Sequence, residues 1–241
     1  MRCVFLYLAL LLTVSCGKDE RASDESEVAD IVFSYEQIGY LPYRKAVIAS
    51  SQGEKASLVL YLHGGTSRGE DNTAQIAEPA VDSIASYLAS HRVNSVFVVP
   101  QCPSDKFWDS AVCATLKSLI DYHVANGDVD ARRIYILGGS MGGTGTWTMI
   151  SSYPNLFAAA MPVAGNPSRC DAASVAATPV LTVMGEEDRI MDVGVVADFC
   201  NRVVLSGGDA VLETETGWTH ENTCVWSYVS SRLDWIFGHS R

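Results

Sequence analysis

A serine flanked by glycines in the middle of the chain could act as a nucleophile. Residues 138–142 have the sequence Gly-Gly-Ser-Met-Gly, which gives the pattern G-x-S-x-G around Ser140. An apolar, β-branched run precedes it at 133–137, and a stretch that can form a helix follows at 146–150. A glycine- and serine-rich loop would explain the pattern without chemistry, but strand, serine and helix in this order favour a nucleophile elbow. The glycines then let the two elements pack around a strained serine, whose hydroxyl lies at the start of a helix.

Two later residues could complete a Ser-His-Asp triad. A strand-like run at 180–184 ends in a glycine and three acids, the last of which is Asp188, and a further run at 210–216 leads to His220. The order Ser140, Asp188, His220 is that of α/β-hydrolases and differs from both main serine protease folds. In such a triad the histidine deprotonates the serine during attack, and the acid fixes the histidine tautomer.

The end of an early strand predicts an oxyanion hole. The buried run at 57–62 is followed by His63, Gly64 and Gly65. A strand end of this kind supplies one backbone amide, and the residue after the nucleophile supplies the other. We therefore expect the amides of Gly65 and Met141 to stabilise the oxyanion, each lowering the barrier by roughly 3–4 kcal/mol.

Other residues compete for the roles of acid and base. Glu187 and Asp192 lie in the same loop as Asp188 and remain alternative acids. Of the five histidines, only His220 follows a late strand and lies downstream of the acid. The other four have structural roles more often; they are His63, His91, His123 and His239.

Two tryptophans fall in loops at the expected catalytic edge. Trp108 and Trp218 could form flat aromatic walls of a substrate cleft, although burial in the core is the default for tryptophan. No cysteine has metal-site spacing, and no histidine has a cluster of potential ligands beside it, so we expect neither a metal nor a cofactor.

The chain resembles the compact α/β-hydrolases without a lid, which are grouped as phospholipase/carboxylesterase, dienelactone hydrolase-like and "predicted peptidase" proteins. Some feruloyl and acetyl-xylan esterases are similar. The resemblance runs from about residue 35 to the C-terminus, and it implies a serine carboxylesterase. In one departure, Arg189 to Asp192 stand where relatives tend to place an apolar residue and a proline after the acid. The matching segments are 62–72, 99–103 with Trp108, 138–143, 153–159, 185–188 and His220.

The pattern of elements agrees with this fold class. From residue 31 apolar strands alternate with amphipathic helices, which predicts a mainly parallel sheet with helices on both faces. Two short leading strands should be antiparallel, and a last helix should cover about 223–237. We find no second domain and no insertion long enough for a lid, so the site should be open and shallow. The expected strands are 31–35, 46–50, 57–62, 95–99, 133–137, 158–162, 180–184 and 211–216.

Three function classes follow. We favour a hydrolase of carboxylic esters that are short-chain or aromatic and in some cases linked to carbohydrate. A serine peptidase of the prolyl-oligopeptidase type and a non-catalytic binding lipoprotein are the alternatives. The 241 residues suit one domain, and the net charge of −11 argues against nucleic acid and against unassisted binding to anionic lipid.

The N-terminus predicts export. Residues 1–15 resemble a signal peptide whose apolar core, 4–14, is too short to span a bilayer. Cys16 follows it as in a bacterial lipobox, and 16–30 form an acidic tether before the hydrolase domain at 31–241. We expect a protein anchored through lipid on Cys16 to a bacterial membrane, most simply the outer one. A secreted protein without lipid is the alternative.

Five further cysteines fit an oxidising compartment. Cys102 could pair with Cys113, and Cys200 could pair with Cys224, which leaves Cys170 over. The sequence does not fix the connectivity.

Overall fold

The computed structural model describes residues 31–48, 53–127 and 129–241. The predicted signal peptide (1–15), the acidic tether (16–30) and the lipidation site Cys16 lie outside the described residues. Among the described residues, no helix is both long and apolar enough to cross a membrane.

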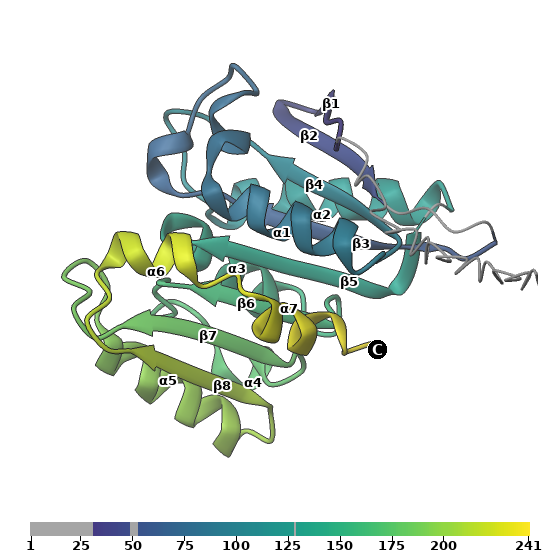
Figure 1. Cartoon of the computed structure of the whole chain (residues 1–241). Coiled ribbons are helices and arrows are strands. Elements are labelled where there is room, and N and C mark those ends of the chain that lie inside the picture. The colour runs from purple at the N-terminus through teal and green to yellow at the C-terminus, as the bar shows by residue number, and fades with distance from the viewer. Residues whose placement is uncertain (1–30, 49–52, 128) are drawn as a thin grey trace, which may run out of the picture.

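One sheet of eight strands organises the described part of the chain, in the order β1-β2-β4-β3-β5-β6-β7-β8 (Figure 1). The two leading strands are antiparallel to their neighbours, and every later pairing is parallel. The predicted α/β-hydrolase fold is confirmed, including its antiparallel start. The strands are β1 (Ser34–Ile38), β2 (Leu41–Ile48), β3 (Ala56–Leu62), β4 (Ser95–Pro100), β5 (Val129–Gly139), β6 (Ala159–Val163), β7 (Val180–Gly185) and β8 (Ala210–Glu215).

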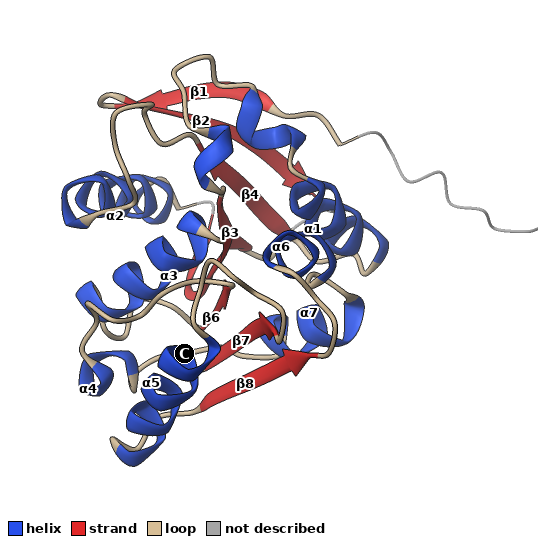
Figure 2. Cartoon of the chain, turned by 90° about the vertical axis from the view of Figure 1, so that its left-hand side faces the viewer, coloured by secondary structure: helices blue, strands red, loops and turns tan. Residues whose placement is uncertain are grey.

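The central strands are apolar because helices cover both of their faces. Every residue of β3, β4, β6 and β7 is buried, as expected for parallel strands inside an α/β protein. Two hydrophobic clusters lie on opposite faces, one under α2, α3, α4 and α5 and the other under α1 and α7 (Figure 2). The helices are α1 (Pro79–Ser90), α2 (Ser110–Ala125), α3 (Met141–Ser152), α4 (Ala172–Val175), α5 (Val193–Leu205), α6 (His220–Trp226) and α7 (Ser230–Phe237).

The C-terminal segment differs from the prediction. One helix over about 223–237 was expected, whereas α6 and α7 are separate helices. The chain breaks between them because Val229 adopts extended backbone angles, with φ −91° and ψ 158°. In place of a further helical bond, the carbonyl of Ser227 accepts the amide of Val229 (3.0 Å) and the guanidinium of Arg232 (3.3 Å). The break lets α6 lie at the catalytic edge while α7 packs on the sheet (Figure 1).

The five described cysteines are free thiols, so neither predicted disulfide forms. Cys102, Cys113 and Cys200 are buried in the hydrophobic core instead. Burial raises the pKa of the Cys113 thiol to about 12 and that of Cys200 to about 11, which keeps both protonated and unreactive.

Candidate active site

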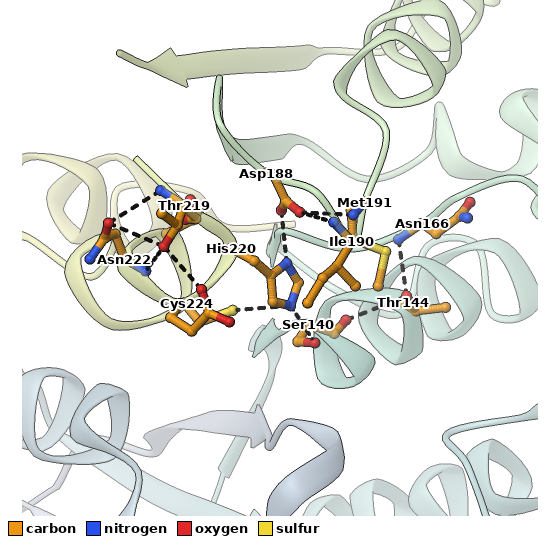
Figure 3. A network of polar contacts seen from close by, with 12 residues as sticks. Ser140, Thr144, Asn166, Asp188, Ile190, Met191, Thr219, His220, Asn222 and Cys224 are labelled. Atoms are coloured by element: carbon orange, nitrogen blue, oxygen red, sulfur yellow. Dashed lines mark hydrogen bonds and ion pairs between the residues drawn. The ribbon is translucent and has the colours of Figure 1, made fainter. Parts of the chain in front are cut away.

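Ser140 lies at the sharp turn between β5 and α3. Its backbone angles are φ 57° and ψ −117°, a conformation that is strained for a residue other than glycine. The Ser140 amide donates to the carbonyl of Val163 (3.0 Å), which ties the turn to the end of β6. The strained turn presents the hydroxyl at the start of α3, as the sequence predicts (Figure 3).

The two fixed glycines of the pattern are required by close backbone contacts. A Cβ on Gly138 would lie 2.5 Å from the carbonyl oxygen of Gly142, and a Cβ on Gly142 would lie 1.8 Å from the carbonyl oxygen of Leu62. A Cβ on Gly139 would meet its nearest atom, the hydroxyl of Tyr61, at an ordinary 3.5 Å. The G-x-S-x-G pattern is therefore the steric requirement of this strand–helix junction.

Ser140, His220 and Asp188 form a hydrogen-bonded chain (Figure 3). The Ser140 hydroxyl lies 2.7 Å from Nε2 of His220, and Nδ1 of His220 lies 2.8 Å from Oδ2 of Asp188. The other carboxylate oxygen accepts the amides of Ile190 and Met191, each at 2.8 Å. The Asp188 side chain has no exposed surface, so its charge is balanced by these donors and directed at the imidazole.

The competing acids have other partners. The Asp192 carboxylate accepts the amides of Gly194 (2.8 Å) and Val195 (3.3 Å) and so caps α5. The Glu187 side chain is exposed. Among the described residues, Asp188 is the acid in contact with the imidazole of His220.

Two tight junctions bring Asp188 and His220 together. A Cβ on Gly185, at the end of β7, would lie 2.2 Å from the carbonyl oxygen of Trp218, so the loop after β7 packs directly on the turn after β8. Thr219 and Asn222 then form a capping box that fixes the start of α6, where His220 is the first residue. These two junctions bring Asp188 and His220, which are far apart in the sequence, into contact.

The predicted oxyanion amides face the same region. Gly65 and Met141 line one cavity with Ser140. Met141 is the first residue of α3, whose amide has no partner within the helix. Within the described part of the chain, no hydrogen bond uses the amide of Gly65 or of Met141. Both N–H groups are therefore free to bind an oxyanion.

His63 fixes the direction of one of these amides. The carbonyl of Gly64 lies 2.6 Å from Nδ1 of His63, and the amide of Cys102 donates to Nε2 at 2.9 Å. Because a backbone amide can only donate, Nε2 is the acceptor and Nδ1 carries the proton. The peptide between Gly64 and Gly65 is trans and planar, so holding the carbonyl aims the Gly65 N–H in the opposite direction.

Glu78 holds the same loop from the other side. Its carboxylate accepts the amide of Gly64 (2.9 Å) and the hydroxyls of Ser67 and Tyr61, both at 2.7 Å. Sequence reasoning missed Glu78, since an acid before a helix-starting proline has no feature that separates it from a simple helix cap. The His-Gly-Gly motif was the available signal for His63.

The cavity beside Ser140 has a volume of about 550 Å³. Trp108 borders it, but this side chain is only 3% exposed and its indole N–H donates to the carbonyl of His63 (3.0 Å). Trp218 does not line the cavity. Its ring packs edge-on against Trp226 of α6, with 5.5 Å between centroids, and the guanidinium of Arg232 lies over it at 5.8 Å.

The thiol of Cys224 is a second potential nucleophile near the triad. Its sulfur lies 4.0 Å from Nε2 of His220. Burial raises the pKa of this thiol to about 12, so it stays protonated and does not compete with Ser140.

The sheet order and the elbow define an α/β-hydrolase. A family model described as the prolyl oligopeptidase family matches residues 113–168, a segment that contains Ser140 but neither Asp188 nor His220. The chain is similar to poly(3-hydroxyalkanoate) depolymerase C of Paucimonas lemoignei, with 28% identity over 128 residues, 51% of this chain and 31% of the depolymerase. It is also similar to acetylxylan esterase A of Emericella nidulans, with 27% identity over 184 residues, 69% of this chain and 57% of the esterase.

A solved structure of a thermostable esterase superposes with a TM-score of 0.73 and 25% identity, covering 89% of this chain and 64% of the esterase. The chain therefore spans less than two thirds of each of these three proteins.

Proposed function

We propose that the protein is a serine hydrolase that cleaves carboxylic esters through an acyl-enzyme on Ser140. The observation that carries the proposal is the chain of contacts from Ser140 to His220 (2.7 Å) and from His220 to Asp188 (2.8 Å). Gly65 and Met141, whose amides have no partner among the described residues, line the same cavity as Ser140. The similarity to an acetylxylan esterase and a thermostable esterase supports ester substrates.

The geometry accounts for each step of acyl transfer. The Ser140 oxygen bonds to the ester carbonyl carbon while its proton passes to Nε2 of His220, and Asp188 stabilises the imidazolium. The carbonyl oxygen, now negatively charged, accepts hydrogen bonds from the N–H groups of Gly65 and Met141. His220 then gives its proton to the leaving oxygen as the carbon–oxygen bond breaks. Water repeats the sequence on the acyl-enzyme, which releases the acid and restores the Ser140 hydroxyl.

We place the preferred substrates among short-chain or aromatic esters, including those linked to carbohydrate. Within the described residues, no insertion forms the large apolar cover that would suit a long acyl chain. The test compares kcat/KM for p-nitrophenyl esters, methyl ferulate, acetylated xylan and a sixteen-carbon acyl ester. We expect the long chain to be the poorest substrate, and a clear preference for it would contradict this assignment. A folded protein that a fluorophosphonate probe fails to label at Ser140 would contradict the reaction itself.

A serine peptidase of the prolyl-oligopeptidase type is the second candidate. It is favoured by the family match over residues 113–168, which covers the segment around the elbow. A proline-containing peptide amide in the same panel separates the two. Faster turnover of the amide than of every ester would establish the peptidase and overturn the esterase.

We also propose that the protein is exported and anchored to a bacterial membrane through lipid on Cys16. The apolar run at 4–14, which only Ser15 separates from Cys16, supports this. Several acyl chains hold a protein on a membrane far better than one. Mass spectrometry of the mature N-terminus should find Cys16 first and acylated, and Cys16→Ser should move the protein to the soluble fraction. An unmodified N-terminus would overturn the anchor.

A further inference from the structure

The cavity beside Ser140 lies on one side of the triad. Ser140, Gly65 and Met141 line it, whereas His220 and Asp188 do not. In the proposed reaction His220 protonates the leaving oxygen, so the alcohol half of an ester must lie beside Nε2. A cavity that is lined by the nucleophile and by both predicted oxyanion residues, but not by the proton donor, is therefore placed to hold the acyl half.

The cavity continues along the hydroxyl-bearing face of α3. Thr144, Thr148 and Ser151 line it, and all three are half-buried. They recur at helical spacing, and the distance along α3 from Ser140 to Ser151 is about 16 Å at 1.5 Å per residue. An acetyl group would fill only the first part of this space. The cavity therefore has room for a longer acyl group whose far end is polar.

One wall of the cavity is a loop that hydrogen bonds attach to α3 at two points. The amide of Asn166 donates to the hydroxyl of Thr144 (2.9 Å, Figure 3), and the amide of Asp171 donates to the hydroxyl of Ser151 (3.0 Å). Arg169 lies between these two attachment points and lines the cavity. Its backbone is thus held at the level of the second and third turns of α3.

Arg169 is exposed to solvent at the rim of the cavity, and its charge has no counterion within the described part of the protein. No carboxylate of the described residues pairs with its guanidinium. The nearby Asp171 and Asp109 accept backbone amides and cap α4 and α2. The chain has a net charge of −11, so an unpaired cation on the wall of this cavity runs against the overall charge. A guanidinium is the side chain best suited to a carboxylate, which it can bind through two parallel hydrogen bonds.

We propose that this cavity binds the acyl half of the substrate and that Arg169 binds a carboxylate at its far end. The preferred substrates are then esters of acyl groups that carry a second acidic group. This inference rests on the proposed esterase function. The rise of α3 places the Arg169 backbone roughly 10 Å from Ser140, which suits monoesters of dicarboxylic acids of adipate to suberate length.

The test uses the mono-p-nitrophenyl esters of adipic and suberic acid and, as neutral partners, the same esters with a terminal carboxamide. We expect the full-length enzyme to prefer the carboxylate by about tenfold or more in kcat/KM, mainly through KM. Arg169→Gln should remove this preference and leave the carboxamide esters within about twofold. Arg202→Gln is the matched control, because it removes the same charge from the exposed face of α5, where Arg202 pairs with Asp198. The control should keep the preference.

Other results would contradict either the role of Arg169 or the proposed esterase function. Equal rates for carboxylate and carboxamide esters, or a preference that survives Arg169→Gln, would overturn the assignment of Arg169. Equal losses in Arg169→Gln and Arg202→Gln would also overturn it, since they would show a general effect of charge. Failure of the folded enzyme to hydrolyse any of these esters, or to react with a fluorophosphonate, would instead overturn the proposed function.

Discussion

Two histidines near Ser140 have opposite surroundings. His63 directly follows β3 and has no exposed surface, and its ring nitrogens contact the backbone of Gly64 and Cys102. His220 begins α6, and its ring nitrogens contact the Asp188 carboxylate and the Ser140 hydroxyl. Both rings are fully hydrogen-bonded, so the number of bonds does not separate a proton carrier from a structural residue.

The difference lies in what each partner allows. A proton gained by His220 is stabilised by a carboxylate on the other ring nitrogen, so this imidazole can accept and return a proton. A proton gained by His63 at Nε2 would face the amide N–H of Cys102, which cannot accept it. Burial also lowers the pKa of His63. His63 is therefore suited to hold a peptide in place, and His220 to move a proton.

The largest expected effect comes from removing the Ser140 hydroxyl, the group that His220 deprotonates. Ser140→Ala should lower kcat for ester hydrolysis by about 10⁶-fold, and at the least by three orders of magnitude, because no other group is placed to attack. Circular dichroism should show an intact fold. Ser118→Ala is the matched control on α2, where the hydroxyl bonds only to the carbonyl of Ala114, and it should keep full activity. Substantial turnover by Ser140→Ala would show that another residue is the nucleophile.

The next effect tests the carboxylate that distinguishes His220 from His63. Asp188→Asn should lower kcat by about 10⁴-fold, because an amide holds the wrong tautomer and cannot stabilise the imidazolium. Asp192→Asn and Glu187→Gln should stay within about fivefold of the native rate. Asparagine caps a helix about as well as aspartate, so Asp192→Asn also preserves α5. If Asp192→Asn were the inactive variant, the acid would lie one turn further along the loop.

A smaller effect tests whether His63 positions the oxyanion peptide. Asparagine can place its amide N–H near Nδ1, and glutamine can place its carbonyl near Nε2. His63→Asn should keep the bond to Gly64, whereas His63→Gln should keep only the bond from Cys102. We expect His63→Gln to lose about 10- to 100-fold in kcat, with less change in KM, and His63→Asn to lose less. Equal losses in the two variants would mean that His63 only stabilises the fold.

Sequence reasoning succeeded where a local pattern determines a local structure. Steric contact requires Gly138 and Gly142, so the motif indicated the elbow once a strand-like run before it and a helix-forming stretch after it were recognised. The buried runs gave the parallel strands, since only β-branched and apolar residues suit a strand covered on both faces.

Contacts set by tertiary packing were beyond the sequence. The ring of Trp218 packs against Trp226 of α6, and Arg232 of α7 binds the Ser227 carbonyl where the two helices separate. The role of Glu78 depends on three partners, which come from β3 and from the loop that follows it. No spacing in the sequence encodes such a set of distances.

The smallest expected effect tests the contrast between His63 and His220 by measuring the free energy of unfolding instead of a reaction rate. The pKa of His63 is lowered in the folded protein, whereas in the unfolded chain it should be about 6.5. Below pH 6.5 the unfolded state therefore binds a proton that folded His63 does not, and the free energy of unfolding falls with falling pH. The stabilisation that neutral His63 contributes is fully present above pH 6.5, and it is lost at up to about 1.4 kcal/mol per pH unit down to the folded pKa.

His63→Gln removes this titrating group from both the folded and the unfolded state, so the free energy of unfolding of this variant should depend less on pH between 6.5 and 5.5. Urea denaturation of the two proteins at pH 7.5, 6.5 and 5.5 measures the difference, with His91→Gln as a control for the loss of a histidine as such. Parallel curves for the native protein and His63→Gln would show that His63 accepts a proton as readily when folded as when unfolded, and the contrast with His220 would then rest on geometry alone.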